Sequence, residues 1–250
     1  MKPGAKQTLG LIGFGQFGRL AARHLTGCFD LTISDVEDRS AEAALMGAAF
    51  GRLDQASACD IVIVAVPVAA MKQTFADIAP HVRPGALVMD VASVKVLPAL
   101  WMIQTLPAHA DIVATHPLFG PQSARDGLEG LRLVLCPVRG ERAHEVKAIA
   151  EAAGLIVSIT TPEEHDQEMA YVQALTHLIG RSLVNVKIPD EDLKTRSYQH
   201  LLDLCGLIGD DSFELFSAIQ TLNPYASDVA RAFVAEATSL LNQVHGQPKG

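Results

Sequence analysis

The chain has 250 residues, 49% of them hydrophobic and only 5% aromatic, and a formal net charge of −8. A chain of this length can bury a substantial core, and its aliphatic composition suits parallel strands that are buried on both faces. The acidic balance argues against nucleic acid or an anionic membrane as the main partner.

Targeting and redox features indicate the cytoplasm. No apolar run approaches the ~20 residues that span a bilayer, and the first residues lack the apolar core of a signal peptide. The four cysteines are scattered without a Cys-x-x-Cys pair. The sequence therefore predicts a cytoplasmic protein with neither a zinc site nor a disulfide framework.

A glycine-rich turn follows the first apolar run, Leu9–Ile12, and precedes apolar residues at helical spacing. In such a turn the first glycine makes the bend, the second lets the backbone approach a pyrophosphate, and the third lets the helix pack on the strand. The N–H groups at the helix start would then face the phosphates. We predict cofactor contacts from the whole turn, namely Gly13, Phe14, Gly15, Gln16, Phe17 and Gly18.

Asp35 ends a second predicted strand, Asp30–Asp35, about 20 residues past the glycine turn. An acidic residue at that place accepts a hydrogen bond from the ribose 2′-hydroxyl and repels a 2′-phosphate. This favours NAD over NADP, although Arg39 lies close enough in the sequence to soften the preference. The alternative is that Asp35 is an ordinary helix N-cap.

Two further strands place polar groups at their ends. The strand at Asp60–Pro67 is the strongest in the sequence, and Val66 and Pro67 should pass close to the adenosine half of the cofactor. After a helix at 71–78, the strand at 85–91 runs into Ser93 and Lys95. Ser93 could cap the next helix, contact the reacting group, or do both.

His116 follows an apolar run at 111–114 and precedes Pro117. In open α/β sheets the C-terminal ends of strands are where ligands bind. An imidazole there can take or give a proton near neutral pH. The alternative is a histidine that only bonds to backbone.

The remaining pattern changes at Pro162. Strands at 131–138 and 155–160 with a helix at 141–153 complete a doubly wound, Rossmann-type sheet, so the fold class is α/β. Beyond it, apolar spacing predicts helices at 163–186, 191–208, 211–222 and 225–244. We therefore expect a dinucleotide-binding domain at 1–162 and an all-helical domain at 163–250 that pairs with a second copy in a homodimer.

Four stretches carry a resemblance to a known family. They are Gly13-Phe-Gly-Gln-Phe-Gly18, Asp90-Val-Ala-Ser-Val-Lys95, Thr115-His-Pro-Leu-Phe-Gly-Pro121 and Glu164-His-Asp-Gln-Glu-Met-Ala-Tyr-Val-Gln-Ala-Leu-Thr-His177. Together they resemble the prephenate and arogenate dehydrogenases of tyrosine biosynthesis, over nearly the whole chain. The glycine motif is shared with many dehydrogenases, and the last stretch is the most specific.

The resemblance implies oxidative decarboxylation of prephenate or arogenate, giving 4-hydroxyphenylpyruvate or tyrosine and CO₂. The family moves a hydride from C4 of a cyclohexadienol ring to NAD(P). The residue matching His116 accepts the proton of the C4 hydroxyl, and the serine matching Ser93 bonds the same hydroxyl. The histidine matching His177 contacts the substrate, with Gln173 and Arg181 one turn before and after it; the alternative is a core histidine.

One departure concerns the substrate carboxylate. Many family members hold it with an arginine in the later helices, where this chain has Leu207. Arg196 and Lys95 are the replacements that the sequence suggests. Asp211 or Glu214 could recognise an amine, so the sequence leaves the choice between prephenate and arogenate open.

Two other functions are also compatible with the sequence. One is another two-domain NAD(P)-dependent dehydrogenase or imine reductase, and another is a non-catalytic NAD-binding sensor. Within the family reading, His165 and Asp166 are assigned to helix initiation and domain packing, and no metal is expected because Glu164-His-Asp lacks metal-ligand spacing. We also expect a monofunctional enzyme, since no mutase or regulatory segment is evident.

Overall fold

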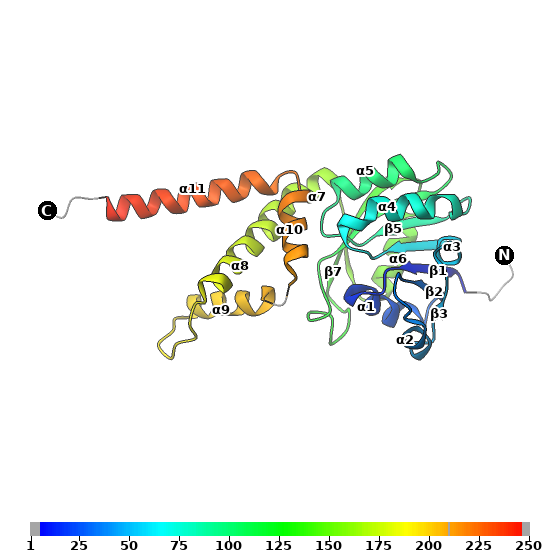
Figure 1. Ribbon diagram of the computed structural model, residues 1–250, viewed down its shortest axis with the longest axis horizontal. Helices are drawn as coiled ribbons and strands as arrows, with labels where there is room; N and C mark the ends of the chain where they lie inside the picture. The colour runs from blue at the N-terminus through cyan, green and yellow to red at the C-terminus, as the bar shows by residue number, and fades with distance from the viewer. Residues whose placement is uncertain (1–5, 210, 247–250) are drawn as a thin grey trace. The chain divides into compact units, whose positions relative to one another are not determined.

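The computed structural model describes residues 6–209 and 211–246. The chain divides into two compact units, residues 1–163 and 164–250 (Figure 1). The division falls one residue after the boundary expected from the sequence. Each unit is described below by itself.

The described residues of the first unit form one eight-stranded sheet with the order β3-β2-β1-β4-β5-β6-β7-β8. Neighbouring strands are parallel except β6 and β7, which pair antiparallel. This arrangement confirms the predicted doubly wound sheet. The strands are β1 Thr8–Ile12, β2 Asp30–Ser34, β3 Ala49–Phe50, β4 Ile61–Val64, β5 Leu87–Asp90, β6 Asp111–Pro117, β7 Arg132–Arg139 and β8 Ile156–Ile159.

Helices cover both faces of this sheet, as right-handed crossovers between parallel strands require. Residues of α1, α2 and α6 join one hydrophobic core with the strands, whereas α3 contacts β1 and β2, α5 contacts β6 and β7, and α4 packs against α3 and α5. The chain crosses closely at Gly10, where an added Cβ would lie 1.9 Å from the carbonyl oxygen of Ala56 in α3. The helices are α1 Gln16–Leu25, α2 Ser40–Leu45, α3 Leu53–Ser57, α4 Val68–Ile78, η1 Ala79–His81, α5 Val96–Thr105 and α6 Ala143–Ala152.

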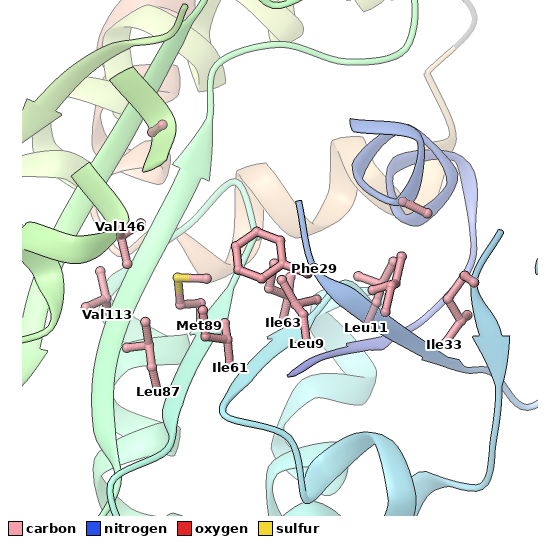
Figure 2. Close-up of a cluster of buried hydrophobic side chains, with 14 of the residues drawn as sticks. Leu9, Leu11, Phe29, Ile33, Ile61, Ile63, Leu87, Met89, Val113 and Val146 are labelled. Atoms are coloured by element: carbon pink, nitrogen blue, oxygen red, sulfur yellow. The ribbon is translucent and has the colours of Figure 1, made fainter. Parts of the chain in front are cut away.

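Aliphatic side chains from successive strands make the core of the first unit (Figure 2). Leu9, Ile61, Met89 and Val113 lie beside one another on one face, and each is at most 8% exposed. Burying a side chain of this size contributes roughly 1.5–3 kcal/mol. The apolar side chains of the buried strands pack into this core and so fix the positions of the strand ends, where the polar residues begin.

The second unit is entirely helical within its described residues. Its helices are α7 Pro162–Met169, the π-helix η2 Ala170–Leu175, α8 Thr176–Val186, α9 Arg196–Ile208, α10 Phe213–Leu222 and α11 Ala226–His245. The predicted helix at 163–186 is therefore interrupted by a π-helical segment. Its core joins Ala174 of η2 to Ile219 of α10 and Ala226 of α11.

The helix ends follow from local sequence. Pro162 occupies the first helical position of α7, which suits proline's fixed φ. α8 ends where Lys187 adopts a left-handed conformation, at φ 58°, two residues before Pro189. The hydroxyls of Thr195 and Ser212 cap α9 and α10 by accepting from backbone N–H groups three residues later. None of the helices in the described ranges has the length and apolar character needed to cross a membrane.

Candidate active site

The predicted site residues of the first unit lie along one edge of the sheet. Strands β1, β2, β4, β5 and β6 are mutually parallel, so their C-terminal ends share that edge. The glycine turn follows β1, Asp35 follows β2, and Pro67 lies just after β4. Ser93 lies just after β5, and His116 lies within the last two residues of β6.

The glycine turn has the geometry that a dinucleotide pyrophosphate needs. Gly13 has φ +96° and an added Cβ would meet the Ala65 carbonyl oxygen at 2.6 Å, while at Gly18 it would meet the Gly13 carbonyl oxygen at 2.2 Å. Apart from its chain neighbours, no heavy atom of the described residues lies within 4 Å of a Cβ built on Gly15, so the backbone there is open to a ligand. Gly15 precedes α1, whose first turn carries no acidic residue, leaving its N–H groups suited to an anion.

Asp35 ties this turn to the end of β2. One carboxylate oxygen accepts from the backbone N–H of Phe14 at 2.6 Å, and the other accepts from the N–H of Glu37 at 2.9 Å. Asp35 is therefore no N-cap of an α-helix, because α2 begins only at Ser40. Besides holding the turn, Asp35 lines a cleft along this edge of the sheet.

A cleft of about 750 Å³ runs along this edge. Of the predicted cofactor residues, Gly13, Gly15, Asp35, Val66 and Pro67 line it. Phe14, Gln16, Phe17 and Gly18 do not; Phe14 is 1% exposed within the core, and Phe17 pairs with the ring of Phe119 at 6.3 Å. Sequence reasoning missed several lining residues, including Ser34, Val36, Arg52, Gln55 and Thr74.

The arginines near the cleft are each paired with a carboxylate. Arg39 pairs with Glu37, Arg52 pairs with Asp54 at 2.7 Å, and Arg19 pairs with Glu42 at 2.5 Å. The pKa of the Glu42 carboxyl is lowered, chiefly by its hydrogen bond from Arg19. These pairs leave the Asp35 end of the cleft acidic.

Ser93 and His116 come from neighbouring strands. β5 and β6 pair in parallel with Asp90 beside Ala114, so Ser93 lies three residues past that pair and His116 two residues past it. Ser93 is half-buried and His116 is 3% exposed. The two side chains thus belong to adjacent strand ends, as the sequence predicted.

Lys95 has a different position from the one expected for a substrate ligand. Its side chain is 0% exposed, and its ammonium pairs with Asp90 and donates to the carbonyl of Thr115 at 2.6 Å. Asp90 in turn accepts from the N–H of Thr115 at 3.2 Å and of Ala92 at 2.9 Å. Because Thr115 precedes His116, this buried network ties the serine end of β5 to the histidine end of β6.

The second unit carries its own polar cluster on η2 and α8. The atoms Gln173 Oε1, His177 Nδ1 and Arg181 Nε are buried and have no hydrogen-bond partner among the residues that the structure describes. They lie on successive turns of one helix face. A π-helical segment such as η2 often marks a functional site, and this one carries Gln173 directly ahead of His177.

Asp211 lies opposite His177. Its carboxylate oxygen is 3.5 Å from His177 Nδ1, and its backbone carbonyl accepts from Arg181 Nη2 at 2.6 Å. Burial is the main cause that lowers the pKa of His177; the Arg181 charge also lowers it, and the Asp211 carboxylate opposes both. The cluster therefore combines an imidazole, a carboxylate and a guanidinium.

Arg196 does not join this cluster. α8 and α9 pack as an antiparallel hairpin, in which an added Cβ on Gly180 would lie 2.5 Å from Ile208 at the end of α9. Arg196 is exposed at the other end of the hairpin, beyond Val186. His177 lies nine residues before Val186, or about 14 Å along the helix, so the structure does not bring Arg196, which the sequence suggests as a ligand of the substrate carboxylate, next to His177.

Comparison with known proteins identifies the family. The sequence profile of the nucleotide-binding domain of prephenate dehydrogenase matches residues 22–158, and the profile of its dimerization domain matches residues 161–249. The chain belongs to the prephenate dehydrogenase family. The resemblance seen in the four sequence stretches is thereby confirmed. The first profile match begins after the glycine turn, whose assignment rests on the geometry above.

Relatives with assigned names point the same way. The chain is 29% identical to Arogenate dehydrogenase 1, chloroplastic, of Arabidopsis thaliana, covering 98% of this chain and 40% of that protein. It is 30% identical to Arogenate dehydrogenase 2, chloroplastic, of the same plant, covering 96% of this chain and 71% of that protein. The chain thus spans less than half of the first relative and about seven-tenths of the second.

Solved structures of the family share the fold. A prephenate dehydrogenase from A. aeolicus, in complex with hydroxyphenyl propionate and NAD+, superposes with a TM-score of 0.79 at 21% identity, over 97% of this chain and 92% of that one. The arogenate dehydrogenase of Synechocystis gives a TM-score of 0.70 at 20% identity, over 94% and 90%. Both units of the prephenate dehydrogenase fold are therefore represented.

Proposed function

We propose that the chain oxidises and decarboxylates arogenate in preference to prephenate, with NAD as the hydride acceptor. The observation that carries the reaction class is the placement of Ser93 and His116 at neighbouring strand ends, on the edge that also carries the glycine turn. Family membership and the names of the Arabidopsis relatives support the substrate class. The NAD+ bound by the A. aeolicus relative supports the cofactor.

The ring chemistry needs a base at one hydroxyl. NAD, when bound, takes the hydride that leaves C4 of the substrate ring. As positive charge develops on C4, His116 accepts the hydroxyl proton and so favours a C4 carbonyl. The bond between C1 and the ring carboxylate then breaks, CO₂ leaves, and the electron pair makes the ring aromatic. The phenolate oxygen takes the proton back from His116, which gives tyrosine from arogenate.

Ser93 has a supporting role in this proposal. Its hydroxyl can donate to the oxygen on C4 while His116 accepts from it, which fixes the direction of the proton. Positioning of this kind lowers the barrier without further chemical groups, since aromatisation makes the step strongly downhill. The buried Lys95–Asp90 pair keeps the two strand ends in register.

Asp211 supports arogenate as the substrate. Arogenate carries an α-ammonium where prephenate carries a keto group, and a carboxylate favours the cation. Two backbone hydrogen bonds fix the position of Asp211: its N–H donates to the Ile208 carbonyl at 3.0 Å, and its carbonyl accepts from Arg181. We propose that His177 and Gln173 contact the same end of the substrate, since each has a buried atom that makes no hydrogen bond within the described part of the chain.

Three finer assignments complete the proposal. NAD rather than NADP is supported by Asp35 in the cleft and by the pairing of Arg39 and Arg52 with neighbouring carboxylates. A homodimer through the second unit is supported by its match to a dimerization domain. A cytoplasmic location is supported by four cysteines that are all free thiols.

NADH formation by the purified protein tests the reaction, with arogenate and prephenate offered separately and each paired with NAD or NADP. We expect turnover with NAD, faster on arogenate. His116→Asn should lower kcat by about 10²- to 10⁴-fold, because the general base is lost. The affinity of the variant for NAD should stay within about threefold of the wild type, since His116 lies outside the residues that line the cleft.

Two outcomes would contradict the proposal. Absence of turnover on both substrates while NAD still binds would show that the edge at His116 serves another reaction or a sensor. Full activity of His116→Asn would show that His116 is not the base. Ser93→Ala serves as an intermediate case, for which we expect a smaller loss of kcat than for His116→Asn.

A further inference from the structure

Arg181 in the His177 cluster forms no salt bridge with any carboxylate of the described residues. Its guanidinium packs over the ring of Phe216, with 5.6 Å between the guanidinium carbon and the ring centroid. One of its donors reaches the Asp211 carbonyl at 2.6 Å, and its Nε is buried without a partner. In the described part of the chain no carboxylate forms a salt bridge with it, and the Asp211 carboxylate faces His177 instead.

A half-buried guanidinium without an anion lowers the stability of the fold, because a buried donor loses its hydrogen bonds to water and gains no acceptor in the protein. The surroundings of Arg181 hold it in place all the same: Phe216 supports one face and the Asp211 carbonyl fixes one end. A guanidinium held in one orientation presents its remaining donors as a planar fork, which matches a carboxylate. The missing partner is therefore an anion that comes with the ligand.

We propose that Arg181 binds the carboxylate at the amino-acid end of the substrate, beside the Asp211 carboxylate that binds its ammonium. The two residues then recognise both charges of the zwitterionic amino-acid group. The hydrogen bond from Arg181 to the Asp211 carbonyl keeps the cation and the anion next to each other. This inference rests on the proposed function and names the cation that neither Lys95 nor Arg196 can supply, since Lys95 is fully buried in its pair with Asp90 and Arg196 lies at the far end of the hairpin.

The sequence places Arg181 beside His177 but does not reveal that it could bind a carboxylate. It lies one turn after His177 on the same helix face, but its contacts come from Asp211 and Phe216 in and just before α10. Those contacts depend on how α10 follows the α8–α9 hairpin. The positive charge of Arg181 also contributes to lowering the pKa of the His177 imidazole, after burial, which is the main cause.

Steady-state kinetics of three variants test the assignment. Arg181→Met should raise KM for arogenate by about 10- to 100-fold, as expected for the loss of a charge-assisted hydrogen bond, with kcat changed by less than about threefold. Arg181→Lys should recover part of the loss, because it keeps the charge without the fork. Arg196→Met, at the far end of the hairpin, is the matched control and should leave KM unchanged.

Competition by tyrosine and tyramine separates binding from folding. The two differ only in the carboxylate, so the wild type should prefer tyrosine and Arg181→Met should lose that preference while still binding tyramine. Equal loss of both ligands, or an unchanged preference for tyrosine, would overturn the role of Arg181. Turnover of arogenate by the wild type tests the proposed function separately. If the wild type turns over arogenate and the Arg181 variants behave like it, the proposed function stands and only the role of Arg181 is overturned.

Discussion

Asp211 owes its position to three contacts, made by its N–H, its carbonyl and its carboxylate, rather than to a regular element. It precedes the Ser212 cap of α10, its N–H and carbonyl are both bonded, and its carboxylate lies 3.5 Å from His177 Nδ1. A side chain fixed in this way loses little entropy when a ligand binds. The negative charge is then available to discriminate between an amine and a ketone.

Asp211→Asn should therefore shift the substrate preference toward prephenate. The amide keeps the shape and removes the charge that attracts the α-ammonium, so the ratio of kcat/KM for arogenate to that for prephenate should fall by about 10- to 100-fold. Glu214→Gln, an exposed acid in the first turn of α10, is the control and should leave the ratio unchanged. An unchanged ratio in Asp211→Asn would assign the preference elsewhere.

His177 should make stability depend on pH in one window. Burial lowers the pKa of its imidazole in the folded state from the ordinary value of 6.5. Below about pH 6.5 the unfolded chain therefore binds more protons than the folded one, so the free energy of unfolding falls as pH decreases through this window and is unaffected above it. Denaturant titrations of the wild type and His177→Gln between about pH 5 and 8 measure this; parallel curves would contradict it.

At the scale of elements, the ends of β5 and β6 are joined by the buried Lys95–Asp90 pair. Removing one partner of such a pair leaves an uncompensated charge, which costs about 3–5 kcal/mol. Lys95→Met should destabilise the protein by that amount in denaturant titrations. Lys147→Met, which removes a surface pair with Glu151, should cost less than about 1 kcal/mol.

The double variant Lys95→Met with Asp90→Asn sharpens this prediction. Neutralising both partners should restore most of the stability, because no buried charge remains. Turnover should recover less, since the donor to the Thr115 carbonyl next to His116 is still missing. A single Lys95→Met variant with wild-type stability would show that the pair contributes nothing to the register of the two strand ends.

At the scale of the whole molecule, α11 carries exposed apolar side chains that suit the proposed homodimer. Phe233, Leu240 and Val244 are 40%, 53% and 73% exposed and recur at helical spacing. Leu240→Asp should convert a dimer to a monomer in sedimentation velocity at micromolar concentration, because burying the new charge is unfavourable. Gln243→Asp on the same helix is the control, and a wild type that is already monomeric would refute the dimer.

Much of the first unit could be predicted from its sequence. The glycine turn, the apolar runs of β4 and β6 and the polar residues after them are local patterns, and the sheet places them on one edge. The antiparallel pairing of β6 and β7 could also have been found, because residues 118–131 contain no helix that could make a parallel crossover. The short elements α2, β3 and α3 have too few residues to show a period.

The errors concern contacts that connect distant segments. Lys95 reads as a free ammonium in the sequence, and its burial depends on Asp90 and Thr115 lying beside it. The separation of Arg196 from His177 depends on the register of the α8–α9 hairpin. The π-helix η2 leaves no recognisable sign in the apolar spacing of 163–186.

The hydrogen bond from the Phe14 N–H to Asp35 has a consequence for how cofactor preference can evolve in this lineage. A substitution that admits a 2′-phosphate by removing both side-chain oxygens of Asp35 also removes the acceptor that holds the glycine turn. Serine or alanine at this position should therefore weaken the use of both cofactors at once. Asparagine keeps an oxygen for the Phe14 N–H while removing the charge. A selection for activity with NADP that starts from this chain should therefore yield Asp35→Asn first.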